Sequence, residues 1–160
     1  MTSPTDLPPP VLPRVLLVDD DEVNLLLTST ALRQRGFDVT EATSGEEALA
    51  LLARRTPEIV VLDAQMPGLD GFETCAALRG MPGLATVPVL MLTGLDDDAS
   101  VARAYRAGAT DFFVKSAQWS LLAERLNFLL RSSRTYVELE RSKAKLARAQ
   151  HLNERKGLEL

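Results

Sequence analysis

The chain has 160 residues, 46% of them apolar, and a net charge of −4, which suits one globular domain with an appended segment. No stretch approaches 18 consecutive apolar residues, so the sequence predicts no membrane span. One cysteine, Cys75, excludes an internal disulfide, and one histidine, His151, excludes a His/Cys zinc cluster. Because the start lacks the basic and apolar regions of an export signal, we expect a cytoplasmic protein.

The charges are distributed unevenly along the chain. Residues 1–130 contain 10 Lys/Arg and 18 Asp/Glu, a balance of −8, whereas residues 131–160 contain 8 and 4, a balance of +4. The first residues, MTSPTDLPPPVLP, are rich in proline. We therefore expect a disordered leader over residues 1–13, a folded domain over 14–130, and a helical linker or coiled-coil extension over 131–160.

Short apolar runs alternate with segments of helical periodicity from Arg14 to about Leu130. The predicted strands are Val15–Val18, Phe37–Val39, Ile59–Leu62, Val87–Leu92 and Phe112–Val114. The predicted helices are Val23–Arg35, Gly45–Arg54, Gly71–Arg79, Ala99–Ala107 and a last one from about Gln118. Because the runs are apolar almost throughout, the alternation indicates a parallel sheet covered by helices on both faces.

Residues typical of helix ends support these boundaries. Gly36 and Gly108 each follow a predicted helix, where a glycine commonly ends it. Thr43 or Ser44 can cap the second helix, and the acidic residues after them suit its first turn.

The last helix is predicted to be long, because no glycine or proline follows Gln118 until Gly157. Two series of apolar residues recur in it at heptad spacing, Leu139 with Leu146, and Leu130 with Val137 and Ala144. A serine at 133 and charges at 140 and 143 interrupt any clean seam. Two interpretations remain open: a solvated, charged linker, or a coiled coil that makes the protein a parallel homodimer.

Polar side chains stand at the carboxyl ends of four predicted strands. Asp19 and Asp20 follow the first strand, Asp63 closes the third, Thr93 the fourth and Lys115 the fifth. Because the carboxyl ends of parallel strands lie at one edge of the sheet, these groups should converge there. Clustered carboxylates suit Mg²⁺, which offsets their repulsion, and a nearby lysine can flank a phosphoryl group. Taken alone, each has a simpler explanation; the acidic run, for example, can be a helix N-cap.

Around these residues the sequence resembles the receiver domain of two-component response regulators. The resemblance covers about Arg14 to Leu130 and rests on VLLVDDDE, VVLDAQMPGLDG, LMLTG and AGATDFFVK in this order. It implies a flavodoxin-like, doubly wound α/β fold with a five-stranded parallel sheet in the order 2-1-3-4-5. Five helices belong to that fold, the last of them here extended at the C-terminus.

The resemblance also implies the metal ligands and the phosphoacceptor. Asp63 would accept the phosphoryl group. Asp20 and Asp63 would bind Mg²⁺ directly together with the backbone carbonyl of Gln65, while Asp19 would act largely through bound water. Asp21 would be an extra carboxylate that starts the helix.

The remaining residues implied by the resemblance surround the phosphoryl group. Thr93 would bond one phosphoryl oxygen and Lys115 another, and the small Gly94 would leave room for them. Met66-Pro67-Gly68 would shape the loop beside the acceptor. Phe112 stands where family members often carry an aromatic residue that couples to the threonine. Since phenylalanine has no hydroxyl, a Thr93–Phe112 switch would work through packing; alternatively, Phe112 is only a core residue.

One departure from the family concerns Ser116, which stands where a proline usually follows the lysine through a cis bond. A cis bond to a residue other than proline costs about 3 kcal/mol. We therefore expect a trans Lys115–Ser116 peptide and a shifted loop before Trp119.

The favoured function is a phosphorylation-controlled regulatory domain rather than an enzyme in the usual sense. It would take a phosphoryl group from a histidine kinase or phosphotransfer protein and signal to an output module of the diguanylate cyclase, phosphodiesterase or kinase type. One alternative is a Mg²⁺-dependent phosphatase with an aspartyl nucleophile, although DDDE differs from the usual DxDx[TV]. Another is a degenerate receiver acting only as an interaction module. Without a helix-turn-helix pattern we expect no direct DNA binding, and we expect His151 to be a surface residue rather than a phosphotransfer site.

Overall fold

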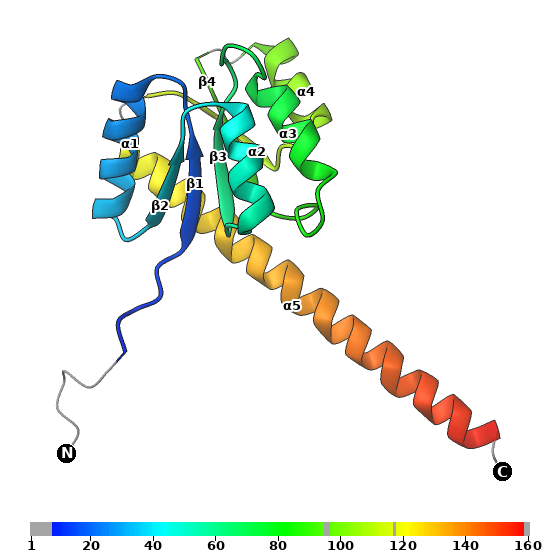
Figure 1. Cartoon of the computed structure of the whole chain (residues 1–160). Helices are drawn as coiled ribbons and strands as arrows, with labels where there is room; N and C mark the ends of the chain where they lie inside the picture. Colours follow the sequence, from blue (N-terminus) through cyan, green and yellow to red (C-terminus); the bar gives the residue numbers. More distant parts are fainter. Residues whose placement is uncertain (1–7, 95–96, 117, 159–160) are drawn as a thin grey trace, which may run out of the picture.

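In the part of the chain that the structure describes, residues 8–94, 97–116 and 118–158, five strands alternate with five helices (Figure 1). In this computed structural model the strands are β1 (Arg14–Val18), β2 (Asp38–Ala42), β3 (Ile59–Asp63), β4 (Val89–Thr93) and β5 (Asp111–Val114). The helices are α1 (Glu22–Gln34), α2 (Gly45–Arg54), α3 (Gly71–Arg79), α4 (Asp98–Arg106) and α5 (Trp119–Leu158). The predicted alternation is confirmed.

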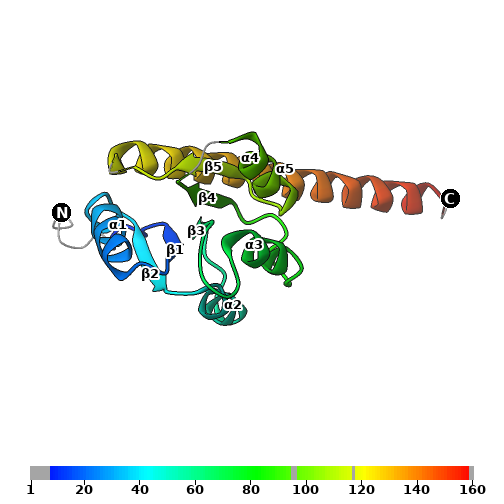
Figure 2. The same cartoon turned by 90° about the horizontal axis from the view of Figure 1, so that it is seen from above.

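All strand pairs are parallel, and the order across the sheet is β2-β1-β3-β4-β5. Two apolar layers enclose the sheet, one with α1 and α5 and the other with α2, α3 and α4 (Figure 2). Leu17 and Leu126 belong to the first layer, and Leu62 and Leu78 to the second. The flavodoxin-like doubly wound fold is therefore confirmed, and it brings the carboxyl ends of β1, β3, β4 and β5 to one edge.

The edge strand β2 was predicted at Phe37–Val39 and lies instead at Asp38–Ala42. Its exposed Asp38 and Thr40 are interspersed with the buried Val39 and Ala42, whereas β3 and β4 are buried throughout. Because the prediction followed continuous apolar runs, it left out the polar Thr40 and Glu41. Phe37 is buried but belongs to the turn after α1. Gly36 opens that turn with φ +91°, and the Phe37 amide donates to the Leu32 carbonyl at 3.2 Å.

Side-chain caps fix where the helices begin. Asp21 caps α1, since its carboxylate accepts hydrogen bonds from the amides of Val23 and Asn24. Ser44 rather than Thr43 caps α2, and its hydroxyl accepts from the Glu47 amide. The predicted helix start at Asp21 is thus confirmed.

Helix α5 is continuous over 40 residues, which confirms the long helix (Figure 1). Its first turns are buried against β4, β5 and α1 through Leu122, Leu126 and Leu130. From Arg134 to Gly157 every side chain is exposed, and the helix leaves the domain at the pole where the strands begin. Arg134 anchors this exit through an ion pair with Glu58 at 2.9 Å. No helix among the described residues combines the length and apolar character needed to cross a bilayer.

Candidate functional site

The acidic run after β1 divides into two parts. Asp19 is buried, its amide donates to the Ala42 carbonyl, and its Oδ1 accepts the Asp21 amide at 2.9 Å. Asp21 is turned into the cap of α1 and its carboxylate is used there. Asp19 and the exposed Asp20 therefore remain as the carboxylates of this run that face the edge of the sheet.

Asp63 closes β3 and is only 3% exposed. Its Oδ1 accepts the Gln65 amide at 3.2 Å. Immediately beyond, the chain turns so sharply that a Cβ on Gly71 would lie 2.1 Å from the Asp63 carbonyl oxygen. The Gly71 amide donates to the Ala64 carbonyl at 3.0 Å. The backbone at the start of α3 therefore lies in close contact with the backbone of Asp63, the candidate phosphoacceptor.

Three carboxylates converge at this edge. One oxygen from each of Asp19, Asp20 and Asp63 lies within 4.8 Å of the other two. The carboxylates of Asp19 and Asp63 are buried, and that of Asp20 is exposed. Such a set of oxygen ligands suits a hard divalent cation that keeps part of its water shell. These residues therefore fit Mg²⁺, and the backbone of Gln65 lies beside them in the same loop.

Lys115 enters the cluster from the end of β5. Its Nζ lies 2.9 Å from Oδ2 of Asp63 and 3.5 Å from Oδ2 of Asp19, and its amide donates to the Thr93 carbonyl at 2.7 Å. Burial acts to lower the pKa of Lys115, but its hydrogen bond to Asp63 and the two negative charges outweigh it and raise the pKa. The ammonium is therefore a fixed positive charge beside Asp63.

Asp63 itself is held in an environment that disfavours its charged form. Burial, with a smaller contribution from the negative Asp19, raises its pKa from 3.8 to about 6, although Lys115 and the Gln65 amide act in the opposite direction. A carboxylate made basic in this way is a better nucleophile, and it gains from any cation placed against it.

The structure places the other predicted residues around this cluster. Thr93 is buried at the end of β4, and Gly94 follows with open space where a Cβ would point. Phe112 is half-buried on the α2/α3/α4 side, whereas Phe113 packs on the α1/α5 side. The Lys115–Ser116 peptide is trans, as predicted, since no cis bond occurs among the described residues. The shifted loop before Trp119 includes Ala117, which lies outside them.

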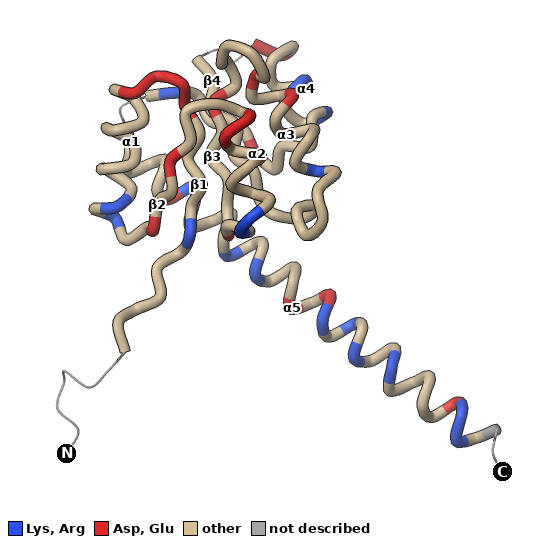
Figure 3. The backbone as a smooth tube through the Cα atoms, in the orientation of Figure 1, with Lys and Arg blue, Asp and Glu red and all other residues tan. Residues whose placement is uncertain are grey.

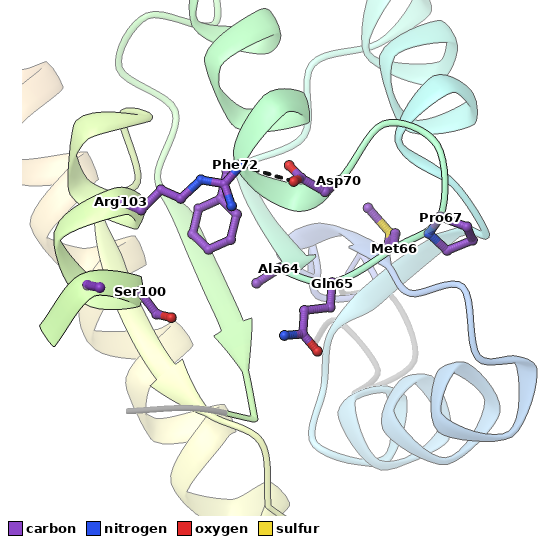
Figure 4. A pocket seen from close by; sticks show the side chains of 9 residues that line it. Ala64, Gln65, Met66, Pro67, Asp70, Phe72, Ser100 and Arg103 are labelled. Atoms are coloured by element: carbon purple, nitrogen blue, oxygen red, sulfur yellow. Dashed lines mark hydrogen bonds and ion pairs between the residues drawn. The ribbon is translucent and has the colours of Figure 1, made fainter. Parts of the chain in front are cut away.

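Sequence reasoning did not anticipate a group of residues that joins α4 to the acceptor loop (Figure 4). Arg103 lies over the ring of Phe72, 4.2 Å from its centroid, and forms an ion pair with Asp70 at 3.2 Å. Asp70 also caps α3 with a capping box to Glu73. A cleft of about 640 Å³ runs between this group and Gln65. Arg103 and Asp70 are 33 residues apart, so no local sequence pattern predicts their ion pair.

We expect Arg103→Ala to lower the free energy of unfolding by about 0.5–1 kcal/mol, because it removes a half-exposed ion pair and a cation–π contact. Arg106→Ala, an exposed arginine at the end of the same helix, is the control and should change it by less than about 0.5 kcal/mol. Urea unfolding of both variants measures the difference. Equal losses of unfolding free energy in the two variants would show that the contacts of Arg103 with Asp70 and Phe72 add no stability of their own.

Comparisons with known proteins agree with this geometry. A family model described as the response regulator receiver domain matches residues 15–127. The chain is 36% identical to Response regulator PleD of Caulobacter vibrioides, covering 82% of this chain and 29% of PleD. It is 37% identical to Transcriptional regulatory protein AfsQ1 of Streptomyces coelicolor, covering 75% of this chain and 52% of AfsQ1. Chemotaxis protein CheY4 of Vibrio cholerae superimposes with a TM-score of 0.72 at 29% identity, covering 74% of this chain and 99% of CheY4. The chain thus spans less than a third of the length of PleD and about half of the length of AfsQ1.

Proposed function

Because the chain belongs to the response regulator receiver domain family, we propose that it is a phosphorylation-controlled receiver that accepts a phosphoryl group on Asp63. The donor is the phosphohistidine of a histidine kinase or phosphotransfer protein. The observation that carries the proposal is the contact of Asp63 with Lys115 at 2.9 Å beside the carboxylates of Asp19 and Asp20. Membership of this family speaks against the phosphatase alternative.

In the proposed reaction, a carboxylate oxygen of Asp63 attacks the phosphorus atom. The bond from phosphorus to the donor imidazole nitrogen breaks, and the imidazole leaves with the electron pair. Lys115 holds one phosphoryl oxygen and the Thr93 hydroxyl another. Asp20, Asp63 and the Gln65 carbonyl, with Asp19 largely through bound water, would hold Mg²⁺, which would supply positive charge beside these carboxylates and the phosphoryl oxygens.

Later hydrolysis of the acyl phosphate returns the domain to its unphosphorylated state. Water attacks the phosphorus, the phosphorus–oxygen bond to Asp63 breaks, and inorganic phosphate leaves. The chain therefore changes only its own modification state, and we do not class it as an enzyme. Movement of Thr93 towards the phosphoryl group, followed by repacking of Phe112, is the switch that we propose.

An exposed apolar surface next to the site suits the phosphodonor. Val23, Leu26 and Leu27 on α1 are exposed, and α1 begins at the cap next to Asp19 and Asp20. A partner that presents its histidine to Asp63 has to cover this edge, so it can bury these side chains. We propose that the kinase or phosphotransfer protein docks there.

The output passes through α5 in our proposal. The core residues Leu126 and Leu130 and the exposed extension belong to one helix, so a change in the sheet is carried into residues 131–158. The target is an output module of the diguanylate cyclase, phosphodiesterase or kinase type, in a cytoplasmic protein. We assign no direct DNA contact to the extension, whose charges are mixed (Figure 3).

Phosphorylation by a small-molecule donor tests the proposal. We expect the chain, incubated with acetyl phosphate and Mg²⁺, to gain the mass of one phosphoryl group, and Asp63→Asn to gain none. Asp98→Asn, at an exposed carboxylate in the first turn of α4, is the control and should label like the parent. Intact-mass spectrometry with and without EDTA gives the readout. Labelling that persists in Asp63→Asn would assign the acceptor to another residue, whereas no labelling of the parent from either acetyl phosphate or a phosphohistidine protein would favour the degenerate receiver.

A further inference from the structure

A cleft of about 500 Å³ opens at the pole of the domain where β1 begins, away from the Asp63 site at the other end of the strands. Its walls come from the residues that precede β1, from the end of α1 with the start of β2, and from the residue after α2. Figure 3 shows basic segments at this pole, whereas acidic segments crowd the opposite end of the domain. Apolar and charged side chains line the cleft together, which is typical of a site for a small ligand.

Three arginines line the cleft, Arg14, Arg33 and Arg55. Arg33 is neutralised by Glu41, whose carboxylate lies 3.4 Å from the guanidinium. Neither Arg14 nor Arg55 forms an ion pair with any residue that the structure describes. Asp38 also lines the cleft, but it is not paired with either of them. The cleft therefore carries two positive charges that no described carboxylate neutralises, although residues 1–130 have a balance of −8.

Arg14 also has a hydrogen-bond donor without a partner. Its Nη2 donates to the Thr56 carbonyl at 3.1 Å. Its Nε is the one buried side-chain donor that lacks an acceptor within the described part of the chain. A buried donor without an acceptor costs stability, and a guanidinium binds carboxylate and phosphate oxygens through parallel hydrogen bonds. An oxyanion in the cleft would therefore supply an acceptor to this guanidinium.

The rest of the cleft is apolar. Val11 and Leu12, which precede β1, are 91% and 41% exposed, while Phe37 in the turn after α1 is buried. An apolar group that covers Val11 and Leu12 removes apolar surface from water, which is favourable. The cleft thus offers contacts both to a negative head and to an apolar body.

We propose that this cleft binds a small amphipathic oxyanion, which has a carboxylate or phosphate head on a short apolar body. The head lies between Arg14 and Arg55, and the apolar body covers Val11 and Leu12. The inference goes beyond phosphoryl transfer, because the cleft contains no residue of the phosphorylation site. Arg14 begins β1 and Asp19 follows its end, so about 16 Å of strand separates the two sites.

The charges around the cleft favour a compact head over a long polyanion such as nucleic acid. Asp38 lines the cleft beside the arginines, and Glu41 lies next to Arg33. These carboxylates, together with the negative balance of residues 1–130, repel a chain of phosphates that extends past the cleft. A ligand with one head can contact Arg14 and Arg55 without approaching them.

Isothermal titration calorimetry of the full chain tests the site, with octanoate and octyl phosphate as probes below the concentrations at which they form micelles. We expect at least one of the two to bind. Neutral octan-1-ol, which keeps only the apolar body, should bind about tenfold more weakly or worse. Comparison of the two probes identifies the preferred head. If neither probe binds, or if octan-1-ol binds as tightly, the proposal is wrong.

Variants separate the cleft from the general charge of the surface. Arg55→Gln and Leu12→Ser, both at exposed lining residues, should each weaken binding of the preferred probe by about tenfold or more. Arg54→Gln is the matched control, because Arg54 is also an exposed arginine, one position earlier, but does not line the cleft. It should leave the dissociation constant unchanged. Equal weakening by Arg54→Gln would show that net charge alone attracts the probe and would overturn the proposal.

Amide chemical shifts locate the bound probe. The amides of residues 11–12, 14, 37–39 and 55 should shift when the preferred probe is added, because these residues line the cleft. Shifts confined to α1 around the exposed Val23 and Leu26 would place the probe elsewhere and contradict the assignment. Arg55→Gln should still be labelled on Asp63 by acetyl phosphate, so failure of this proposal is distinguishable from failure of the proposed function.

Discussion

Gly71→Ala is expected to lower the free energy of unfolding by about 3 kcal/mol or more. An alanine Cβ at this position would lie 2.1 Å from the Asp63 carbonyl oxygen and 2.7 Å from the Ala64 Cα. Both are backbone atoms, so no side-chain rotation relieves the overlap, and the start of α3 must move away from the end of β3. This movement also breaks the hydrogen bond from the Gly71 amide to the Ala64 carbonyl.

Gly80→Ala, at the other end of α3, is the control for this substitution. A Cβ on Gly80 would meet only the Ala77 carbonyl oxygen at 3.6 Å, an ordinary contact, and its φ of −83° suits any residue. We expect a change within about 1 kcal/mol, in the stabilising direction, because alanine restricts the unfolded chain. Guanidinium unfolding of both variants provides the comparison. If the two glycines respond alike, the close approach of α3 to Asp63 does not limit stability.

The metal-free protein is expected to become more stable as the pH falls from about 7.5 to about 5.5, by about 1 kcal/mol. The pKa of Asp63 is raised from 3.8 to about 6 in the fold, chiefly by burial. Between these two values the folded state binds more protons than the unfolded state, so the free energy of unfolding increases as protons are added. Lys115, whose pKa is raised above its ordinary value, stays charged throughout this range and adds no slope.

Saturating Mg²⁺ should reverse the sign of this dependence. A metal bound by carboxylates requires them deprotonated, so protons compete with it and the stabilisation by Mg²⁺ weakens towards pH 5.5. Thermal unfolding in EDTA and in Mg²⁺ across the pH range measures both slopes. Asp63→Asn should flatten the metal-free slope; a slope that survives this substitution would assign the titration to another group.

The strand ends were predictable because each apolar run in VLLVDD, VVLD and LMLT stops at a polar residue. That pattern follows from burial on both faces of the central strands, so the sequence alone predicts that Asp19, Asp63 and Thr93 lie at one edge of the sheet. The edge strand β2 could not be read in the same way. Its exposed and buried residues are interspersed, so the polar Thr40 and Glu41 did not belong to a continuous apolar run.

Contacts between segments far apart in the chain could not be predicted from the sequence, for a different reason. Arg103 meets Phe72 and Asp70 only because α4 and the start of α3 lie on the same face of the sheet. The need for glycine at position 71 likewise depends on a backbone atom eight residues earlier. Similarly, the sequence does not show which heptad series of α5 is exposed. The structure shows it, because Leu130 is buried whereas Leu139 and Leu146 are exposed.

The unbroken course of α5 makes it a lever arm. At a rise of about 1.5 Å per residue, the 28 residues after Leu130 extend about 42 Å from the domain. A tilt of about 5° where Leu126 and Leu130 pack on the sheet displaces the far end by about 4 Å, comparable to the rise of nearly three helical residues. Repacking too small to alter the fold therefore becomes a displacement of several ångströms at the far end of the helix.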